Sequence, residues 1–199
     1  MAPVSRTTIV ILVALGAALA GFAFSSAAQR LRDEEPPADT SIAAGPRNAD
    51  LGWRETAGRP GEQLVFTVKS FDIVPRGWRL RLGLENDSSV AFGMGDPRAT
   101  LDRSFGLMLF ETGSIDELQE RNKSGTLPAV RAATRYEPEL PAILEPGASW
   151  EGTISAAGAL VAGSWMRVVF GTLVAVGKPP DELAESIVWI TDHRYELRE

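Results

Sequence analysis

The sequence predicts an all-β fold, an antiparallel sandwich or barrel with one short helical insertion, preceded by a single apolar N-terminal helix. Three observations predict it. Residues 7–28 contain no charged side chain and are rich in Ile, Val, Leu and Ala. From Gln63 onward the apolar residues alternate with a period of two, as they do in strands with one buried face. Turn-forming residues separate about seven such segments, which is typical of antiparallel all-β domains.

The N-terminal apolar segment has two interpretations, and both direct the chain to or across a membrane. As a helix that rises about 1.5 Å per residue, residues 7–28 span about 33 Å, close to the thickness of the bilayer hydrocarbon core. This length favours an uncleaved anchor at residues 1–28. The segment also fits a secretory signal, with Arg6 before the apolar core and small residues at 26–28 before a cleavage site.

Two signals for the orientation in the membrane disagree. Arg6 precedes the apolar segment, whereas Arg30, Arg32 and Arg47 follow it. Because Lys and Arg favour the cytoplasmic side, this count favours a cytoplasmic C-terminal domain. The apolar segment begins within a few residues of Met1, however, as export signals do. We therefore expect a single-pass membrane protein with an extracytoplasmic domain, or a secreted protein if the signal is cleaved.

Residues 29–62 predict a flexible linker between the membrane and a domain at residues 63–199. Charged residues stand beside Pro36 and Pro37, which favour extended backbone, and turn-forming Gly and Pro recur to the end of the segment. Trp53 is the one aromatic residue in it, and it either docks on the domain or lies at the surface.

The clearest strand is at residues 78–85. Trp78, Leu80, Leu82 and Leu84 share one face, and charged residues occupy the other. The segment 64–73 precedes it and switches its apolar face near Ser70, which indicates a β-bulge. Further strands are expected at 90–94 (an edge strand), 105–110, 149–154, 165–176 (a central strand, apolar on both faces) and 186–195.

One segment breaks this alternation and predicts the helical insertion. Ser114 and Glu117 have the capping-box spacing, in which each side chain bonds the other residue's main-chain amide. A short helix to about Asn122 follows, and then a loop that contains prolines. Residues 178–183 predict a second helical turn.

Two turns carry a resemblance to a known group of proteins. An alternating strand ends in Leu84-Glu-Asn-Asp-Ser, and, after the strand at 105–110, Leu144-Glu-Pro-Gly-Ala-Ser-Trp precedes another strand. This arrangement resembles the small immunoglobulin-like domains that bacterial lipoproteins and signal-anchored proteins carry outside the membrane. The resemblance covers residues 63–195 and implies an immunoglobulin-like sandwich, that compartment, and a binding or assembly role. It implies no catalytic residues, and the chain departs from the group in having no lipidated cysteine and in its helical insertion.

The composition narrows the classes of function. A formal net charge of −6 at pH 7 argues against a nucleic-acid partner, because such proteins usually show a basic face. The absence of cysteine excludes a disulfide framework and a thiolate metal site.

No catalytic set, cofactor or metal site is predicted. His193 is the only histidine, and it follows Asp192. Neighbouring strand residues point to opposite faces, so this pair does not predict a Ser-His-Asp relay, and one histidine does not make a zinc site. Oxygen ligands for calcium occur without the spacing of a dedicated loop, so we interpret them as solvated turn residues: Glu85, Asn86, Asp87, Asp96 and Asp102.

A partner surface is expected at residues 114–142, because long loops on a rigid scaffold are where binding sites usually lie. Interleaved carboxylates largely cancel the anion-binding patch that its basic residues and tyrosine would form (Arg121, Lys123, Arg131, Arg135 and Tyr136). Three tryptophans are expected in the core rather than in a carbohydrate platform: Trp78, Trp165 and Trp189.

These observations predict a non-enzymatic, membrane-tethered, extracytoplasmic sandwich that binds another envelope protein or assists an assembly. Two alternatives stay open. The first is an enzyme that acts on envelope substrates through carboxylates such as Glu85 and Asp87, whose proton affinity would be perturbed in a cleft. The second is a small-molecule sensor, which needs an apolar pocket within the sandwich.

Overall fold

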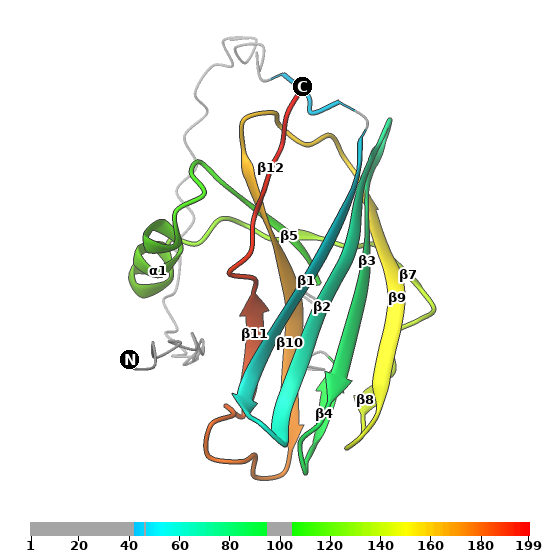
Figure 1. Ribbon diagram of the computed structural model, residues 1–199, viewed down its shortest axis with the longest axis vertical. Helices are drawn as coiled ribbons and strands as arrows, with labels where there is room; N and C mark the ends of the chain where they lie inside the picture. Colours follow the sequence, from blue (N-terminus) through cyan, green and yellow to red (C-terminus); the bar gives the residue numbers. More distant parts are fainter. Residues whose placement is uncertain (1–41, 46, 95–104) are drawn as a thin grey trace, which may run out of the picture.

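Two antiparallel β-sheets pack face to face, and one helix lies against the outside of the second sheet (Figure 1). The computed structural model describes residues 42–45, 47–94 and 105–199. The first sheet has the strand order β1-β2-β3-β9-β7, and the second has the order β6-β5-β10-β4-β8, with β11 and β12 also paired to β10. The all-β sandwich that the alternation predicts is therefore confirmed.

The elements are β1 (Arg47–Arg59), β2 (Glu62–Val74), β3 (Gly77–Asn86), β4 (Ala91–Met94), β5 (Gly106–Phe110), α1 (Ile115–Ser124), β6 (Arg131–Ala132), β7 (Arg135–Glu137), β8 (Ile143–Leu144), β9 (Ser149–Ala157), β10 (Trp165–Val176), β11 (Ser186–Ile190) and β12 (Tyr195–Glu196).

The bulge predicted near Ser70 is present. The register between β2 and β3 shifts between Val68 and Ser70. This shift lets Phe66, on one side of it, and Phe71, on the other, both face the core, where each is 1% exposed. One extra residue thus keeps a strand of changing phase buried along its whole length.

Strand β10 is the axis of the second sheet. It pairs with β5 and β12 near its start and with β4 and β11 toward its end. Val168 and Val169 point to opposite faces, and both are fully buried. The predicted central strand is confirmed with its bounds. The edge assignment of residues 90–94 is wrong, because β4 lies between β10 and β8.

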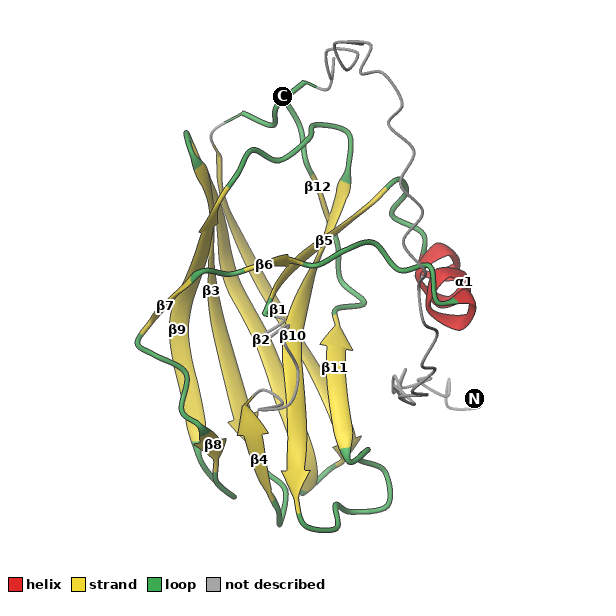
Figure 2. Ribbon diagram, turned by 180° about the vertical axis from the view of Figure 1, so that it is seen from behind, coloured by secondary structure: helices red, strands yellow, loops and turns green. Residues whose placement is uncertain are grey.

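The main core lies between the sheets, and a smaller one lies under the helix. In the main core the rings of Phe66 and Trp189 stack with centroids 4.9 Å apart. The smaller core joins Leu118 of α1 to the outer face of β5, β10 and β11, through Met108, Phe110, Val169 and Ile190. At one edge of the sandwich the chain itself crosses between the sheets, from β6 to β7 (Figure 2).

Helix α1 begins after Ser114, as the sequence predicts. The Ser114 side chain accepts a hydrogen bond from the main-chain N of Asp116 at 3.1 Å. The expected capping box does not form: Ser114 bonds Asp116 instead of Glu117, and Glu117 accepts from Thr112, through its main-chain N at 3.1 Å and its hydroxyl at 2.5 Å. The helix ends at Gly125, whose φ of 70° is the left-handed conformation that glycine adopts readily.

The predicted linker at 29–62 is wrong from residue 47 onward. Residues 47–59 form β1, which pairs with β2 along its length. The inward positions of β1 hold small and polar residues among few apolar ones, so the alternation of apolar residues in the sequence is weak. Trp53, left open between docking and the surface, docks in the core and is 8% exposed. The turn residues that indicated a linker, near Gly61, make the β1–β2 hairpin. Pairing reaches still further back, to a bridge between Ala43 and Val161.

Two other expectations differ from the structure. The strand expected at 186–195 divides into β11 and β12, because residues 191–194 bend away from the ladder. Residues 178–183 are irregular, with a turn at 181–182, and form no helix. The expected anchor at 1–28 and the linker up to residue 41 lie outside the described residues. Within the described ranges, no helix has the length and apolar character needed to cross a membrane.

Candidate binding groove

Glu55 joins the two sheets at the edge opposite the β6–β7 crossing. Its carboxylate accepts hydrogen bonds from Trp189 Nε1 at 2.8 Å and from the main-chain N atoms of Asp192 and His193 at 3.1 and 2.9 Å. It also lies 2.7 Å from His193 Nδ1, and the Trp53 ring stacks on the imidazole at 5.5 Å. The Glu55 side chain is 8% exposed. These five residues, the Glu55 cluster, hold the bend at 191–194 against β1.

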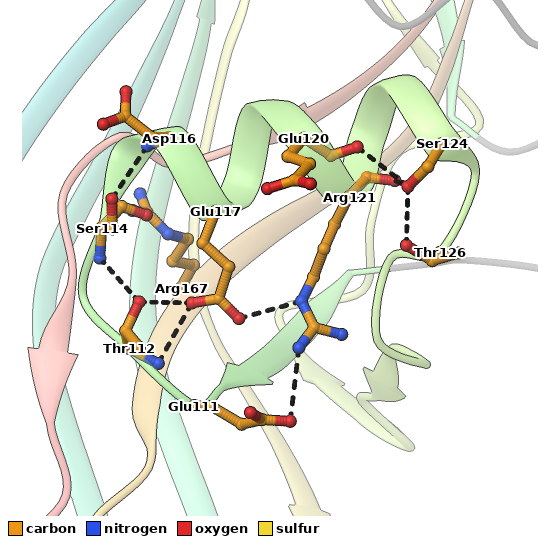
Figure 3. Close-up of polar contacts among 10 residues, drawn as sticks. All are labelled: Glu111, Thr112, Ser114, Asp116, Glu117, Glu120, Arg121, Ser124, Thr126 and Arg167. Atoms are coloured by element: carbon orange, nitrogen blue, oxygen red, sulfur yellow. Dashed lines mark hydrogen bonds and ion pairs between the residues drawn. The ribbon is translucent and has the colours of Figure 1, made fainter.

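Arg167 holds the same bend from inside. It lies on β10 and is fully buried. Its Nη1 donates to the carbonyl O atoms of Thr191 and Asp192 at 2.7 and 2.6 Å, and its Nη2 donates to the carbonyl O of Ser114 at 3.2 Å. Among the described residues its Nε has no hydrogen-bond partner, and its Cζ lies 5.6 Å from the Phe110 ring centroid. Figure 3 shows the guanidinium beneath the first turn of α1, so one side chain positions both the helix and the bend.

Burial governs the proton affinity of the two charged groups here. It lowers the pKa of Arg167, and the nearby Arg194 lowers it further. Burial also raises the pKa of Asp192, and the negative charge of Glu55 raises it further. The positive charges of Arg167 and His193 lower it and partly oppose the rise. A carboxylate enzyme would need a second reactive group beside Asp192. Glu55 does not supply one, because three N–H donors and the His193 ring already surround its oxygens.

Trp165 and Arg194 form a surface feature beside this cluster. The Arg194 Cζ lies 5.8 Å from the Trp165 ring centroid, a cation–π arrangement. Gly113, just before α1, leaves room for both: a Cβ there would lie 2.7 Å from Arg194 Nε and 2.8 Å from Trp165 Cε3. Any larger residue at 113 would therefore displace the arginine or the ring.

Two adjoining hollows, of about 480 and 370 Å³, share Trp165 and Arg194. We call them together the Trp165–Arg194 groove, whose lining residues are Arg47, Trp165, Asp192, His193, Arg194, Tyr195, Glu196 and Arg198.

Two of the three arginines in the groove are candidates for binding an anion. Among the described residues, the ion pairs include neither Arg47 nor Arg194. Arg198 is different, because its Nε and Nη2 donate to Glu196 at 2.9 and 2.8 Å. Two available guanidinium groups beside an aromatic face suit a planar anion such as a carboxylate, which arginine binds through paired hydrogen bonds.

The candidate calcium ligands do not converge. Asn86 is buried and donates to the carbonyl O atoms of Val90 and Leu144, and Glu85 pairs with Arg54 at 3.5 Å. Asp87 accepts from Gln63, while Asp96 and Asp102 lie outside the described residues. In the part of the chain that the structure describes, no cluster of three or more His, Cys, Asp or Glu residues could hold a metal ion.

The structure disperses the basic residues of the insertion. Arg121 pairs with Glu111 and Glu117 on and beside α1. Arg131 lies on β6 of the second sheet, whereas Arg135 and Tyr136 lie on β7 of the first. The anion-binding patch that these residues would form therefore does not assemble, and the arginines that gather lie at the two ends of the domain sequence instead.

Sequence reasoning missed the residues that build the groove. Trp78 and Trp189 are buried as predicted, but Trp165 is only half-buried and lines the groove. Asp192 and His193 lie on a bend and not on a strand, so both border one hollow instead of pointing to opposite sheet faces. One signal was available: Arg167 is a charged residue within the apolar run of β10, which marks it as a buried cation.

A separate hollow of about 460 Å³ lies in the loop between β10 and β11, lined by residues 178–181 and 183–186. Only loop residues and the first residue of β11 line it. It is not the apolar pocket between the sheets that a sensor of small molecules would need.

No protein-family model matches this chain, and comparisons with curated proteins and with solved structures find no match either.

Proposed function

We propose that the protein is a non-catalytic binding module, an immunoglobulin-like sandwich tethered to a membrane outside the cytoplasm, and that the Trp165–Arg194 groove is its partner surface. The apolar segment at 7–28 supports the tether by its length. The partner is an envelope protein that offers an acidic segment.

The observation that carries this proposal is the pair of available guanidinium groups on a rigid wall. The β10 pairings place the main chain of Trp165, and its half-buried ring carries the Arg194 guanidinium on one face, so part of the binding surface exists before a ligand arrives. Pre-ordered contacts leave more of the interaction energy for affinity. The proposed surface thus lies beside the N-terminal end of the insertion expected to bind, at 165 and 192–198, and not within 114–142.

Photo-crosslinking in intact cells tests the proposal. A photoreactive residue at Arg198, on the groove rim, should capture one envelope protein, and the same residue at Arg79, on the outer face of the first sheet, should not. Arg194→Glu should abolish capture, and Arg79→Glu should leave it unchanged. Capture that survives Arg194→Glu, or a reporter fused after Glu199 that is active only in the cytosol, would overturn the proposal.

A further inference from the structure

The imidazole of His193 is held at the rim of the Trp165–Arg194 groove by two residues of β1. The Trp53 ring stacks on it with centroids 5.5 Å apart and an angle of 19° between the planes. Its Nδ1 lies 2.7 Å from Glu55 Oε1, and the His193 main-chain N donates to the same oxygen at 2.9 Å. The His193 side chain is nevertheless 50% exposed and borders one of the two hollows. The fold thus positions the ring and leaves it open to a ligand.

The contact with Glu55 decides which ring nitrogen is left for a ligand. A carboxylate only accepts hydrogen bonds, so Nδ1 carries a proton and donates it to Glu55. In the neutral ring Nε2 is then an acceptor, which offers nothing to a negatively charged ligand. In the protonated ring Nε2 becomes a donor and the ring gains a positive charge. One proton therefore converts this rim of the groove into a charged donor, the kind of group that binds anions well.

We propose that His193 is a third cationic contact of the groove, present only when its ring is protonated, so that an acidic partner segment binds more tightly at mildly acidic pH. The inference rests on the proposed function for the groove and its partner. Histidine is the side chain whose charge ordinarily changes between about pH 5 and 8. Acidification within this range adds a cation beside Arg194, whereas the arginines keep their charge throughout. By linkage, binding of the acidic segment must in turn favour the protonated ring.

Charged groups of both signs face the His193 ring. Glu55 on β1 and Asp192 on the bend attract a positive charge there. Arg194 on the bend, and Arg167 of β10 that holds the bend from inside, repel it. A carboxylate bound between Arg194 and the ring would attract both cations at once. Proton and ligand therefore assist each other at this rim.

Titration of the full chain with one acidic probe tests the inference. The chain is kept in solution by an uncharged detergent, and the probe is N-acetylated tetra-aspartate. Calorimetry gives its dissociation constant at about pH 5.5 and about pH 8, toward the two ends of the histidine range. The parent should bind about threefold more tightly at the acidic pH, the effect of one exposed ion pair.

Three variants assign this pH dependence to a residue. His193→Gln replaces the ring by a neutral amide and should bind equally at both pH values. Asp192 is the competing explanation, because burial raises its pKa and loss of its negative charge would also favour an anion. Asp192→Asn should nevertheless keep the pH dependence of the parent. Asp181→Asn, on the β10–β11 loop, is the matched control and should behave as the parent does.

The parent chain offers a readout that needs no substitution. His193 is the only histidine in the sequence, so its ring gives an NMR signal that can be assigned directly. At about pH 6.5, within the histidine range, the probe should move this signal toward the position of the protonated ring. Arg194→Glu should abolish both the binding and this change.

Three results would overturn the inference alone: equal affinity of the parent at both pH values, a pH dependence that persists in His193→Gln, or binding that leaves the His193 signal in place. Failure of the proposed function looks different. If the probe binds at neither pH, or binds Arg194→Glu as tightly as the parent, the groove is not an anion site and the inference falls with it.

Discussion

Glu55 and Glu151 each bind several donors, but in opposite surroundings. The Glu55 side chain is 8% exposed and receives an indole N–H from β11 of the opposite sheet and two main-chain N–H groups from the bend that follows β11. The Glu151 side chain is 45% exposed on the outer face of the first sheet, where it pairs with Lys69 and Arg81. Hydrogen bonds from Lys69, and then from Arg81, lower the pKa of Glu151.

The difference shows where the sandwich is rigid. Exposed ion pairs between long side chains contribute little, because water screens them and the side chains lose freedom on pairing. Main-chain donors, by contrast, are already ordered in the folded protein. If their buried acceptor is removed, the donors stay out of contact with water without a partner, and the folded state loses stability by their full desolvation penalty. We infer that the groove has a rigid wall, built on Glu55 and Arg167, and exposed binding groups at Arg47 and Arg194.

The largest effect is expected from Arg167→Met. The substitution leaves three buried or half-buried carbonyl groups without their charged donor, at Ser114, Thr191 and Asp192. Unfolding by denaturant should show a loss of about 3 kcal/mol, since removing one side of a buried charged network typically costs this much. Hydrogen exchange should rise in α1 and at 191–194. Arg79→Met, on the exposed outer face, is the matched control, and equal stability of the two variants would refute the role of Arg167.

Glu55→Gln should come next. The amide keeps one oxygen but turns an NH₂ group toward donors, so at least one of the three N–H donors loses its acceptor, at a cost of about 2 kcal/mol. The same change at Glu151 should leave the free energy of unfolding unchanged. The comparison would fail if both substitutions had the same effect, because burial would then not distinguish the two sites.

The architecture could be predicted from the sequence wherever alternation was strong. Strands β3 and β10 were located because their apolar residues follow the period of a strand with one or two buried faces. Strand β1 was missed for a physical reason. Glu55 occupies an inward position and is satisfied by donors from β11 and the following bend, which no local pattern reveals.

The groove could not be predicted, because its residues come from distant parts of the chain. Arg47 begins β1, Trp165 begins β10, and Arg194 precedes β12. Their proximity depends on β12 pairing with the start of β10, a short ladder in which Trp165 pairs with Glu196. The length of its loops favoured the insertion at 114–142 instead, although its interleaved carboxylates were already expected to cancel the charge of its arginines.

The smallest effect expected is a gain of stability in Asp192→Asn. Burial and Glu55 raise the pKa of Asp192 above its ordinary value of 3.8. The folded state therefore holds the proton more tightly, and its stability falls as the pH rises from the ordinary pKa through the raised one. At neutral pH the ionised carboxylate opposes folding, and asparagine removes this penalty. Unfolding measured against pH should show the variant more stable at neutral pH, with the difference vanishing below about pH 3.8.

Asp181→Asn, on the distant β10–β11 loop, is the control. A variant less stable than the parent at neutral pH would mean that the attraction of Arg167 outweighs burial, and that Asp192 belongs with the groups that hold the bend.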